Sequence, residues 1–276
     1  MRRKSILITG CGTNGIGSAL AKEFYRRGHN VFASGRSPEE IDESLVALGC
    51  YALVLDVTSQ ESIARAADRV SCETGGRLDM LVNNAGILHV LPFADTPVDE
   101  VRRVFEVNVF GVWAVTQAML PMLLAARGMV VNIGSVNEVF CPPFFAAYNA
   151  SKAAVEGMSR TMRTELASLG VKVVLVKTGS VGTNLFEADG RTSVPEGSLY
   201  GSMRQWIEER GFFGSVKFAK REDYARAVVD QLLREKPRLV IWEGNLSTVA
   251  WFLSWFGWEG IMVCRVQHGR ECENYY

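Results

Sequence analysis

The pair Tyr148 and Lys152 has the residue types and the spacing needed for acid–base chemistry. The run from 148 to 169 contains no proline and predicts a helix, on which residues four apart lie one turn from each other on the same face. An ammonium group beside a phenol favours the phenolate, so we expect Lys152 to lower the tyrosine pKa from its reference value near ~10. Tyr148 is then a candidate general acid. The alternative, for the pair alone, is a packed tyrosine beside a solvated lysine.

A glycine-rich turn near the start of the chain is the second candidate site. It follows a β-rich run, residues 5–9, and precedes a stretch with helical spacing of apolar residues, 15–27. Backbone amides and a helix N-terminus at such a turn can hold a pyrophosphate, whereas the alternative is a purely structural turn. The residues expected to bind a dinucleotide here are Gly10, Thr13, Asn14, Gly15, Ile16 and Gly17.

The residues after the second predicted strand bear on which dinucleotide binds. Ser34-Gly35-Arg36 stands where an acidic residue would bind the ribose hydroxyls of NAD(H). A hydroxyl and a guanidinium suit a 2′-phosphate, because arginine pairs with phosphate through charge-assisted hydrogen bonds. We therefore expect NADP(H), with Ser34 and Arg36 as ligands. The alternative is an exposed loop arginine without a ligand.

Strands and helices alternate along most of the chain. Further strands are predicted over 30–34, 51–55, 78–83, 129–133, 171–177 and 238–242, and helices over 59–72, 97–126, 148–169 and 221–234. Pro97 after Thr96 suits the first helical position. This alternation predicts a single α/β domain with a Rossmann fold, a doubly wound parallel sheet of about seven strands and helices on both faces. Its dinucleotide-binding half spans about 1–135 and its catalytic half about 136–245, before an aromatic segment, 246–276.

The composition excludes several classes of function. Thirty basic and thirty acidic residues cancel, so nothing points to nucleic acid. Six scattered cysteines and three histidines form no metal-binding pattern. The apolar run from Ile6 to Ile8 is too short for a signal peptide. We expect a cytoplasmic protein with reduced thiols; the alternative is a peripheral position on an intracellular membrane or lipid droplet.

Taken together, the motifs resemble those of the short-chain dehydrogenase/reductase family, from about residue 5 to residue 242. The resemblance rests on Thr9-Gly10, Gly15-Ile16-Gly17, Asp56-Val57, Asn83-Asn84-Ala85-Gly86, Asn108, Ser135 and Tyr148-x-x-x-Lys152. It implies that Tyr148 protonates a carbonyl oxygen that Ser135 polarises, as hydride arrives from a nicotinamide. It also implies that Lys152 holds the nicotinamide ribose and that Asn108 anchors a water in the proton relay.

The same resemblance implies the remaining cofactor contacts. Asp56 and Val57 would meet the adenine, while Val181 and Thr183 would meet the carboxamide. The residues that would line the cofactor cleft are Asn83, Ala85 and Gly86.

Three features depart from the usual pattern of the family. The glycine turn has one extra residue, Thr178-Gly179 stands in place of Pro-Gly, and Glu138 puts a carboxylate where glycine is common. The first two, with residues 241–245 and the aromatic tail, are most similar to the 1-acyldihydroxyacetone-phosphate reductase-like branch. This resemblance implies an NADPH-dependent reductase of a bulky, largely hydrophobic ketone. The alternatives are an alcohol dehydrogenase, or a redox-silent NADP-binding protein or cyclisation catalyst.

Two further expectations concern surfaces. The helices over 97–126 and 148–169 carry small or apolar residues on more than one side, so we expect a homodimer or homotetramer; the alternative is complete burial within one subunit. The aromatic run over 246–264 has three interpretations: a core helix, a cover for the substrate pocket, or a membrane-interface segment. The long insertion over 183–214 is expected to form another wall of that pocket.

Overall fold

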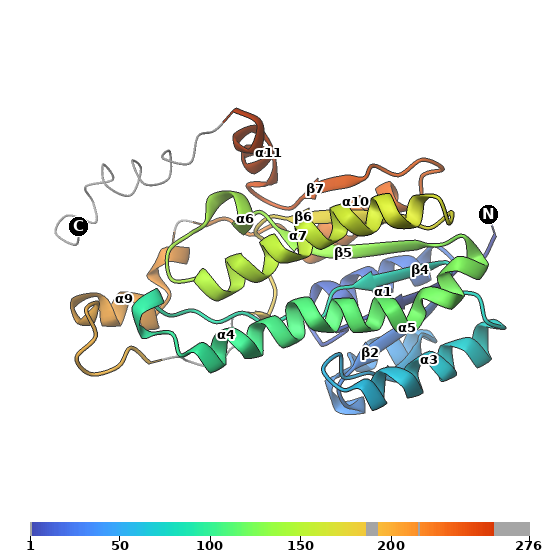
Figure 1. Cartoon of the computed structure of the whole chain (residues 1–276), viewed down its shortest axis with the longest axis horizontal. Coiled ribbons are helices and arrows are strands. Elements are labelled where there is room, and N and C mark those ends of the chain that lie inside the picture. The colour runs from blue at the N-terminus through green and yellow to red at the C-terminus, as the bar shows by residue number, and fades with distance from the viewer. Residues whose placement is uncertain (1, 186–192, 215, 257–276) are drawn as a thin grey trace.

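The chain folds around one parallel sheet. The computed structural model describes residues 2–185, 193–214 and 216–256. Seven strands lie in the order β3-β2-β1-β4-β5-β6-β7 (Figure 1). The strands are β1 (Ser5–Ile8), β2 (Asn30–Gly35), β3 (Tyr51–Val54), β4 (Met80–Asn83), β5 (Met129–Ser135), β6 (Lys172–Thr178) and β7 (Val240–Glu243). The strand order reverses between β1 and β4, which opens a ligand-binding crevice at their carboxyl ends.

Helices cover both faces of the sheet, because alternate residues of each strand point to opposite sides. Ile6 and Ile8 of β1 pack with α1 (Ile16–Arg26) and α10 (Arg221–Leu232). Leu7 packs on the other face, where the covering helices are α3 (Gln60–Thr74), α5 (Gly111–Ala126) and α7 (Ala146–Ala167). The predicted doubly wound α/β fold is therefore confirmed, and its predicted long elements end within two residues of the observed ones.

The predicted helix over 97–126 is present but differs in detail. It comprises α4 (Val98–Phe105), a π-helical turn η3 (Glu106–Phe110) and α5. The prediction that Pro97 is the first helical residue is wrong, because its backbone is extended (φ −64°, ψ 141°) and it precedes the helix as the N-cap. By length and composition alone this helix could cross a membrane. In the fold it instead packs against α3, α7 and β4.

Short elements position the loops around the sheet. They are η1 (Pro38–Glu40), α2 (Glu43–Leu48), η2 (Phe93–Asp95) and α6 (Asn137–Phe140). The described part of the predicted insertion, 193–214, forms η4 (Gly201–Met203), α9 (Arg204–Glu208) and η5 (Gly211–Phe213). Its buried residues Val194, Met203 and Ile207 pack with Leu88 and Phe145 in a third apolar cluster, outside the two sheet faces.

The aromatic run forms helix α11 (Ser247–Phe256), which follows β7 and stands away from the sheet at the top of Figure 1. Its described neighbours are β7 and α6, and only Ser247 and Ala250 are buried. Trp255 and Phe256 are each 72% exposed. The core-helix interpretation is therefore wrong for 247–256, because its aromatic rings remain exposed although the helix contacts β7. Residues 257–264 of the run lie outside the described part of the chain.

Exchanging both exposed rings, Trp255→Ala with Phe256→Ala, is expected to change the melting temperature by no more than about 2 °C, as is usual for surface positions. Phe24→Ala, which empties a fully buried site in the core, should cost about 3–5 kcal/mol and serves as the contrast. Differential scanning calorimetry of the two variants makes the comparison. A fall of many degrees in the melting temperature of the double variant would show that α11 contributes to the core.

Candidate active site

The predicted catalytic residues meet where β5 ends and α7 begins. Ser135 is the last residue of β5, and Tyr148 and Lys152 lie one turn apart near the start of α7. Ser135 and Tyr148 form a hydrogen bond through their side chains. The Ser135 hydroxyl also accepts a hydrogen bond from the backbone N–H of Asn137 at 3.1 Å, which fixes its orientation. The spacing in the sequence thus translates into a hydroxyl pair at the edge of the sheet.

Lys152 is buried beneath this pair. Its ammonium donates to the backbone carbonyl of Ile133 at 2.9 Å and lies 5.6 Å from the centroid of the Tyr148 ring. Burial lowers the pKa of Lys152 to about 8, and the negative charge of Glu138 acts in the opposite direction. The solvated lysine of the alternative interpretation is therefore excluded by the structure, since this side chain reaches the end of β5.

The pKa of Tyr148 corrects the prediction made from the sequence. Burial raises it to about 12, the hydrogen bond to Ser135 lowers it in part, and the charge of Glu138 raises it further. The expected fall caused by Lys152 is wrong for this structure, because the loss of hydration disfavours the phenolate more than its neighbours favour it. The phenol is consequently protonated at neutral pH, which is the state required of a proton donor.

Asn108 ties the active-site elements together. The π turn η3 contains this side chain, which accepts a hydrogen bond from the N–H of Ile87 at 2.8 Å. Its amide nitrogen donates to the Ile87 carbonyl at 2.8 Å and to the Ser151 hydroxyl at 3.0 Å. Gly86 lies against both the Asn108 side chain and the Lys152 ammonium. The side chain of Asn108 therefore fixes the loop after β4 to α7, and its role in holding a water stays a prediction.

The glycine turn lies between β1 and α1, as predicted. Gly10 has a left-handed backbone (φ 72°), and a Cβ there would lie 2.9 Å from the Cα of Ala85. A Cβ on Gly17, in the first turn of α1, would lie 2.3 Å from the carbonyl oxygen of Gly10. The remaining predicted ligands of this turn, Thr13, Asn14, Gly15 and Ile16, lie between these two glycines. Close backbone approach at a helix N-terminus fits the pyrophosphate of a dinucleotide.

Asn84, and not Asn83, contacts the glycine turn. The Asn84 amide donates to the carbonyl oxygens of Thr9 and Gly10 at 2.8 and 2.9 Å, while the Thr9 hydroxyl accepts from the N–H groups of Asn84 and Ala85. The contacts of Asn84 escaped sequence analysis, although the motif contained the residue. They hold the end of β4 against the turn, and the lining of the cofactor cleft by Ala85 and Gly86 stays a prediction.

The prediction that Asn83 lines the cofactor cleft is wrong. Its side chain is buried and donates to the Thr116 hydroxyl at 3.0 Å and to the Asn132 side chain at 2.8 Å. The cause is the alternation of side chains along β4, which places Asn83 on the same face as Leu81, toward α5. Asn83 therefore links β4, β5 and α5 inside the protein.

The residues expected to select NADP(H) have different environments. Ser34 is fully buried and its hydroxyl donates to the Ile8 carbonyl at 3.2 Å, so its prediction as a phosphate ligand is wrong. In β2 this side chain lies on a covered face of the sheet and bonds to the neighbouring strand β1. The Arg36 side chain is 70% exposed and pairs with both carboxylate oxygens of Glu40, at 2.9 and 2.7 Å. A guanidinium is thus present at the end of β2, already paired with a carboxylate.

Asp42 supports this part of the crevice and was missed by sequence analysis. Its carboxylate accepts hydrogen bonds from Ser18 at 2.5 Å and Lys22 at 2.8 Å, both in α1. Its backbone N–H donates to the Cys11 carbonyl at 3.0 Å. These and other hydrogen bonds outweigh burial and hold the pKa of Asp42 far below its usual range. An acidic residue ahead of a short helix was the available signal, since Asp42 is the N-cap of α2.

The other predicted cofactor ligands lie in the segments that follow β3 and β6. Asp56 accepts hydrogen bonds from the N–H and hydroxyl of Thr58, and the buried Val57 packs against Gly111 of α5. Val181 is buried beyond β6, where it forms an isolated bridge with Ala219, and Thr183 follows it at the edge of the described segment. All four lie after the carboxyl ends of β3 and β6, as the motif order requires.

The charge of Glu138 in α6 raises the pKa values of both Tyr148 and Lys152. Its side chain is only 3% exposed, and its Oε1 lies 2.9 Å from the Lys177 ammonium. The expectation of a carboxylate near the pocket therefore becomes a buried ion pair behind Ser135.

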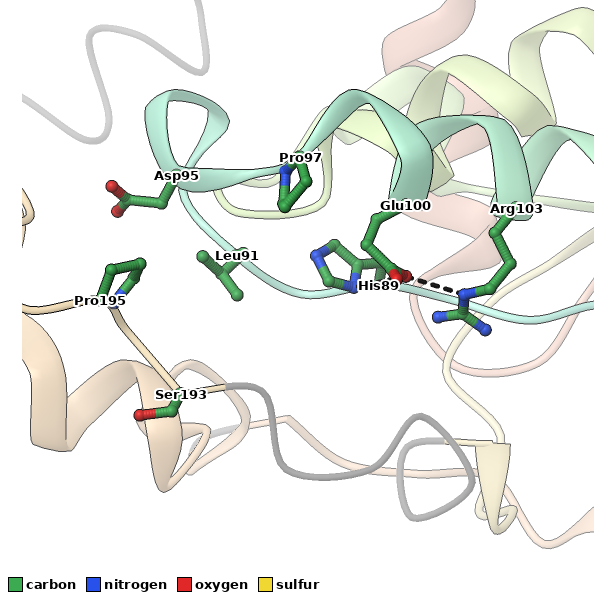
Figure 2. Close-up of a pocket in the computed structure, with 8 residues that line it drawn as sticks. All are labelled: His89, Leu91, Asp95, Pro97, Glu100, Arg103, Ser193 and Pro195. Carbon is green, nitrogen blue, oxygen red and sulfur yellow. Dashed lines mark hydrogen bonds and ion pairs between the residues drawn. The ribbon is translucent and has the colours of Figure 1, made fainter.

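A separate cavity of about 320 Å³ lies between the loop after β4 and the segment around Ser193. Figure 2 shows its polar side, where Glu100 pairs with Arg103 at 2.7 Å. The ring of His89 is buried there, with Nδ1 3.7 Å from Glu100. Ser135, Tyr148 and Lys152 do not line this cavity, so it is separate from the candidate active site.

Comparison with known proteins assigns the family. Residues 4–193 match the short chain dehydrogenase family. Short-chain dehydrogenase fogD from Aspergillus ruber is 39% identical over 95% of this chain and 91% of its own. The structure of a short-chain dehydrogenase from Streptomyces avermitilis has a TM-score of 0.78 and 29% identity, covering 99% of this chain and 98% of that one. NAD⁺-bound xylitol dehydrogenase has a TM-score of 0.71 and 30% identity, with 84% and 92% coverage. The chain belongs to the short-chain dehydrogenase family of oxidoreductases.

Proposed function

We propose that this protein is an NADPH-dependent reductase of a bulky, largely hydrophobic ketone. The observation that carries the proposal is the side-chain arrangement at the end of β5: a protonated phenol bonded to a hydroxyl, above a buried lysine. This arrangement lies at the same edge of the sheet as the glycine turn. A nicotinamide cofactor bound in the crevice would supply the hydride.

The protein's own residues have separate tasks in this reaction. Ser135 and Tyr148 present two hydroxyl groups to one carbonyl oxygen, which polarises the carbonyl and holds it in place. Tyr148 then gives its proton to the developing alkoxide. The Lys152 ammonium beneath the ring stabilises the phenolate that forms, because a cation favours the charged state of a nearby phenol. Asn108 keeps the loop and α7 in register during these steps.

The apolar cluster beside Tyr148 supports a large hydrophobic substrate. The rings of Phe144 and Phe145 are buried near the start of α7, and Tyr148 packs against their cluster. Leu185 and Phe212 pack onto it from the described ends of the insertion. Absorbance of NADPH at its nicotinamide band, followed with ketones of graded size, tests the proposal. Failure to oxidise NADPH with any ketone, combined with tight NADPH binding, would favour the redox-silent alternative.

The same residues can catalyse the reverse reaction. A phenolate at Tyr148 would take the proton of an alcohol while hydride leaves for an oxidised cofactor. The pKa of Tyr148, raised to about 12, keeps the phenol protonated near neutral pH, which is the form that reduction requires. Alcohol oxidation is therefore the second candidate, to be measured at alkaline pH.

The choice of NADPH is supported by the Arg36 guanidinium at the end of β2, since a 2′-phosphate can replace Glu40 as its partner. Arg36→Ala should weaken NADPH binding by roughly tenfold or more, corresponding to about 1.5–3 kcal/mol for a charged hydrogen bond, and leave NADH binding almost unchanged. Glu40→Gln is the matched control, because it frees Arg36 and should strengthen NADPH binding. Titration of nicotinamide fluorescence gives all the affinities. Equal losses for both cofactors in Arg36→Ala would assign Arg36 to the fold.

A further inference from the structure

Helix α11 has its large apolar side chains on the outside. Its small residues Ser247 and Ala250 are buried against the protein, and the residues that stay exposed include all four of its aromatic rings, Trp251, Phe252, Trp255 and Phe256. A helix on the surface of a protein usually turns its apolar side inward and its polar side to water. The orientation of α11 is the reverse, so its outer side needs a partner that the described residues do not supply.

The four rings lie along the outer side of the helix as two pairs. Trp251 and Trp255 are one turn apart, as are Phe252 and Phe256, whose ring centroids are separated by 4.9 Å. An aromatic side chain can bury roughly 150–250 Å². An exposed apolar surface made of several such side chains marks a contact with another protein or with a membrane.

The fold brings two lysines to the start of this helix. No basic residue occurs from the start of β7 to the end of α11, so the charge comes from the segment before α10. The side-chain amide of Asn245 donates to the backbone carbonyl of Lys217 at 2.5 Å. The N–H groups of Asn245 and Ala219 both donate to the Ser180 carbonyl, at 3.3 and 3.0 Å. Lys217 and Lys220 therefore lie beside the residues that lead into α11.

The charge of this segment is positive. Both lysines are exposed, and neither forms an ion pair within the described part of the chain. The carboxylates at the start of α10 already have partners, because Glu222 pairs with Arg221 at 3.1 Å and Asp223 pairs with Arg226 at 3.3 Å. A surface of uncharged aromatic rings is thus bordered by two unneutralised ammonium groups.

This surface is close in the fold to the candidate active site. Helix α11 packs against α6, which begins two residues after Ser135. A largely hydrophobic ketone concentrates in lipid bilayers, because its apolar surface leaves water there. A bilayer is therefore a source of the substrate, a step that rests on the proposed function.

We propose that α11, with Lys217 and Lys220 beside it, docks on the surface of a bilayer that contains anionic phospholipids. Aromatic rings are at home at the boundary between headgroups and acyl chains, where the outer side of α11 is then buried. The lysines attract the anionic headgroups. A bilayer of this kind accounts for the aromatic rings and for the positive charge together.

The test measures the partitioning of the full-length protein onto vesicles by sedimentation, without cofactor or ketone. One set of vesicles is phosphatidylcholine alone, and the other is equimolar phosphatidylcholine and phosphatidylserine. We expect the wild type to bind the second set roughly tenfold or more tightly, since each lysine near an anionic surface contributes about fivefold. This preference should decrease as salt is added, because salt screens exposed charges.

Two double variants separate the two parts of the surface. Trp255→Ala with Phe256→Ala should weaken binding to both sets of vesicles by roughly tenfold or more, because less apolar surface is buried. Lys217→Gln with Lys220→Gln should remove the preference for phosphatidylserine and leave binding to phosphatidylcholine almost unchanged.

Phe93→Ala with Leu199→Ala is the matched control. It removes two apolar side chains that are 83% and 86% exposed, from the segments around η2 and η4, away from α11. Its partitioning should equal that of the wild type. An equal loss in this control and in the aromatic variant would show unspecific adhesion and overturn the proposal.

Failure of the wild type to bind either set of vesicles would also overturn it. Analytical ultracentrifugation then identifies one other occupant: a second copy of the chain covers α11 if the aromatic variant has a lower mass than the wild type. If the aromatic variant does not fold, the lysine variant and the salt series still decide, because vesicle binding that is indifferent to both refutes the proposed surface.

The outcome is independent of the proposed function. Vesicle binding by a protein that reduces no ketone would refute the proposed function only. Ketone reduction by a protein that binds no vesicle would refute the docking surface only.

Discussion

Tyr148→Phe is expected to lower the rate of ketone reduction by roughly 10²–10⁴-fold, the usual cost of losing a general acid. The substitution keeps the ring that packs against the apolar cluster and removes only the hydroxyl that bonds to Ser135. Without that hydroxyl, the developing alkoxide has no proton donor and one hydrogen-bond donor fewer. Single-turnover measurements with NADPH and a large ketone give the effect on the chemical step itself.

Cofactor affinity provides the control for this variant. The phenol contributes less to dinucleotide binding than the glycine turn does, so the dissociation constant for NADPH should stay within about twofold, less than 0.5 kcal/mol. Ser135→Ala, which removes the other hydroxyl of the pair, should also slow reduction but leave the proton donor in place. A Tyr148→Phe enzyme with near-normal turnover would remove Tyr148 from the mechanism.

Gly17→Ala is expected to weaken NADPH binding by roughly ten- to a hundredfold. The added Cβ would lie 2.3 Å from the Gly10 carbonyl oxygen and 2.6 Å from the Asn84 amide nitrogen, closer than atoms can approach. Overpacking of this kind typically costs about 1–3 kcal/mol, and the turn can relieve it only by moving backbone amides away from the pyrophosphate. Fluorescence titration with NADPH measures the loss.

Gly201→Ala is the matched control for this substitution. Gly201 has no atom within 4 Å of the position of a Cβ, so a methyl group there enters open space. NADPH affinity and melting temperature should both stay close to the wild-type values in this variant. If Gly17→Ala binds NADPH as tightly as Gly201→Ala does, the glycine turn does not hold the pyrophosphate.

The sequence was sufficient to predict the sheet and the elements on which Ser135, Tyr148 and Lys152 lie, because both depend on short-range patterns. Alternating apolar runs and helical stretches determine a doubly wound sheet, and Tyr148 and Lys152 are one helical turn apart wherever the helix packs. Ser135 could be placed because it ends a buried strand. These positions follow from neighbouring residues in the sequence and do not depend on how distant segments pack together.

The errors concern side-chain direction and burial, which depend on the assembled fold. Which of Asn83 and Asn84 faces the crevice depends on how β4 is placed in the sheet, and the same is true of Ser34 in β2. The pKa of Tyr148 depends on how much water remains around the phenol, which spacing along a helix does not reveal. The exposure of α11 likewise depends on where the chain goes after β7.

The π turn η3 has a consequence for engineering this enzyme. A π turn holds one more residue than an α-helical turn over nearly the same rise, so the helix on either side of Asn108 differs in phase by one residue. Deleting a single residue between 106 and 110 would restore a regular helix and still preserve its length closely. The two halves would keep their faces, but the wide turn that brings Asn108 to Ile87 and Ser151 would be lost. Chimeras with related enzymes should therefore be joined outside 98–126. An alignment that places a gap in this helix would move the Asn108 side chain away from its partners.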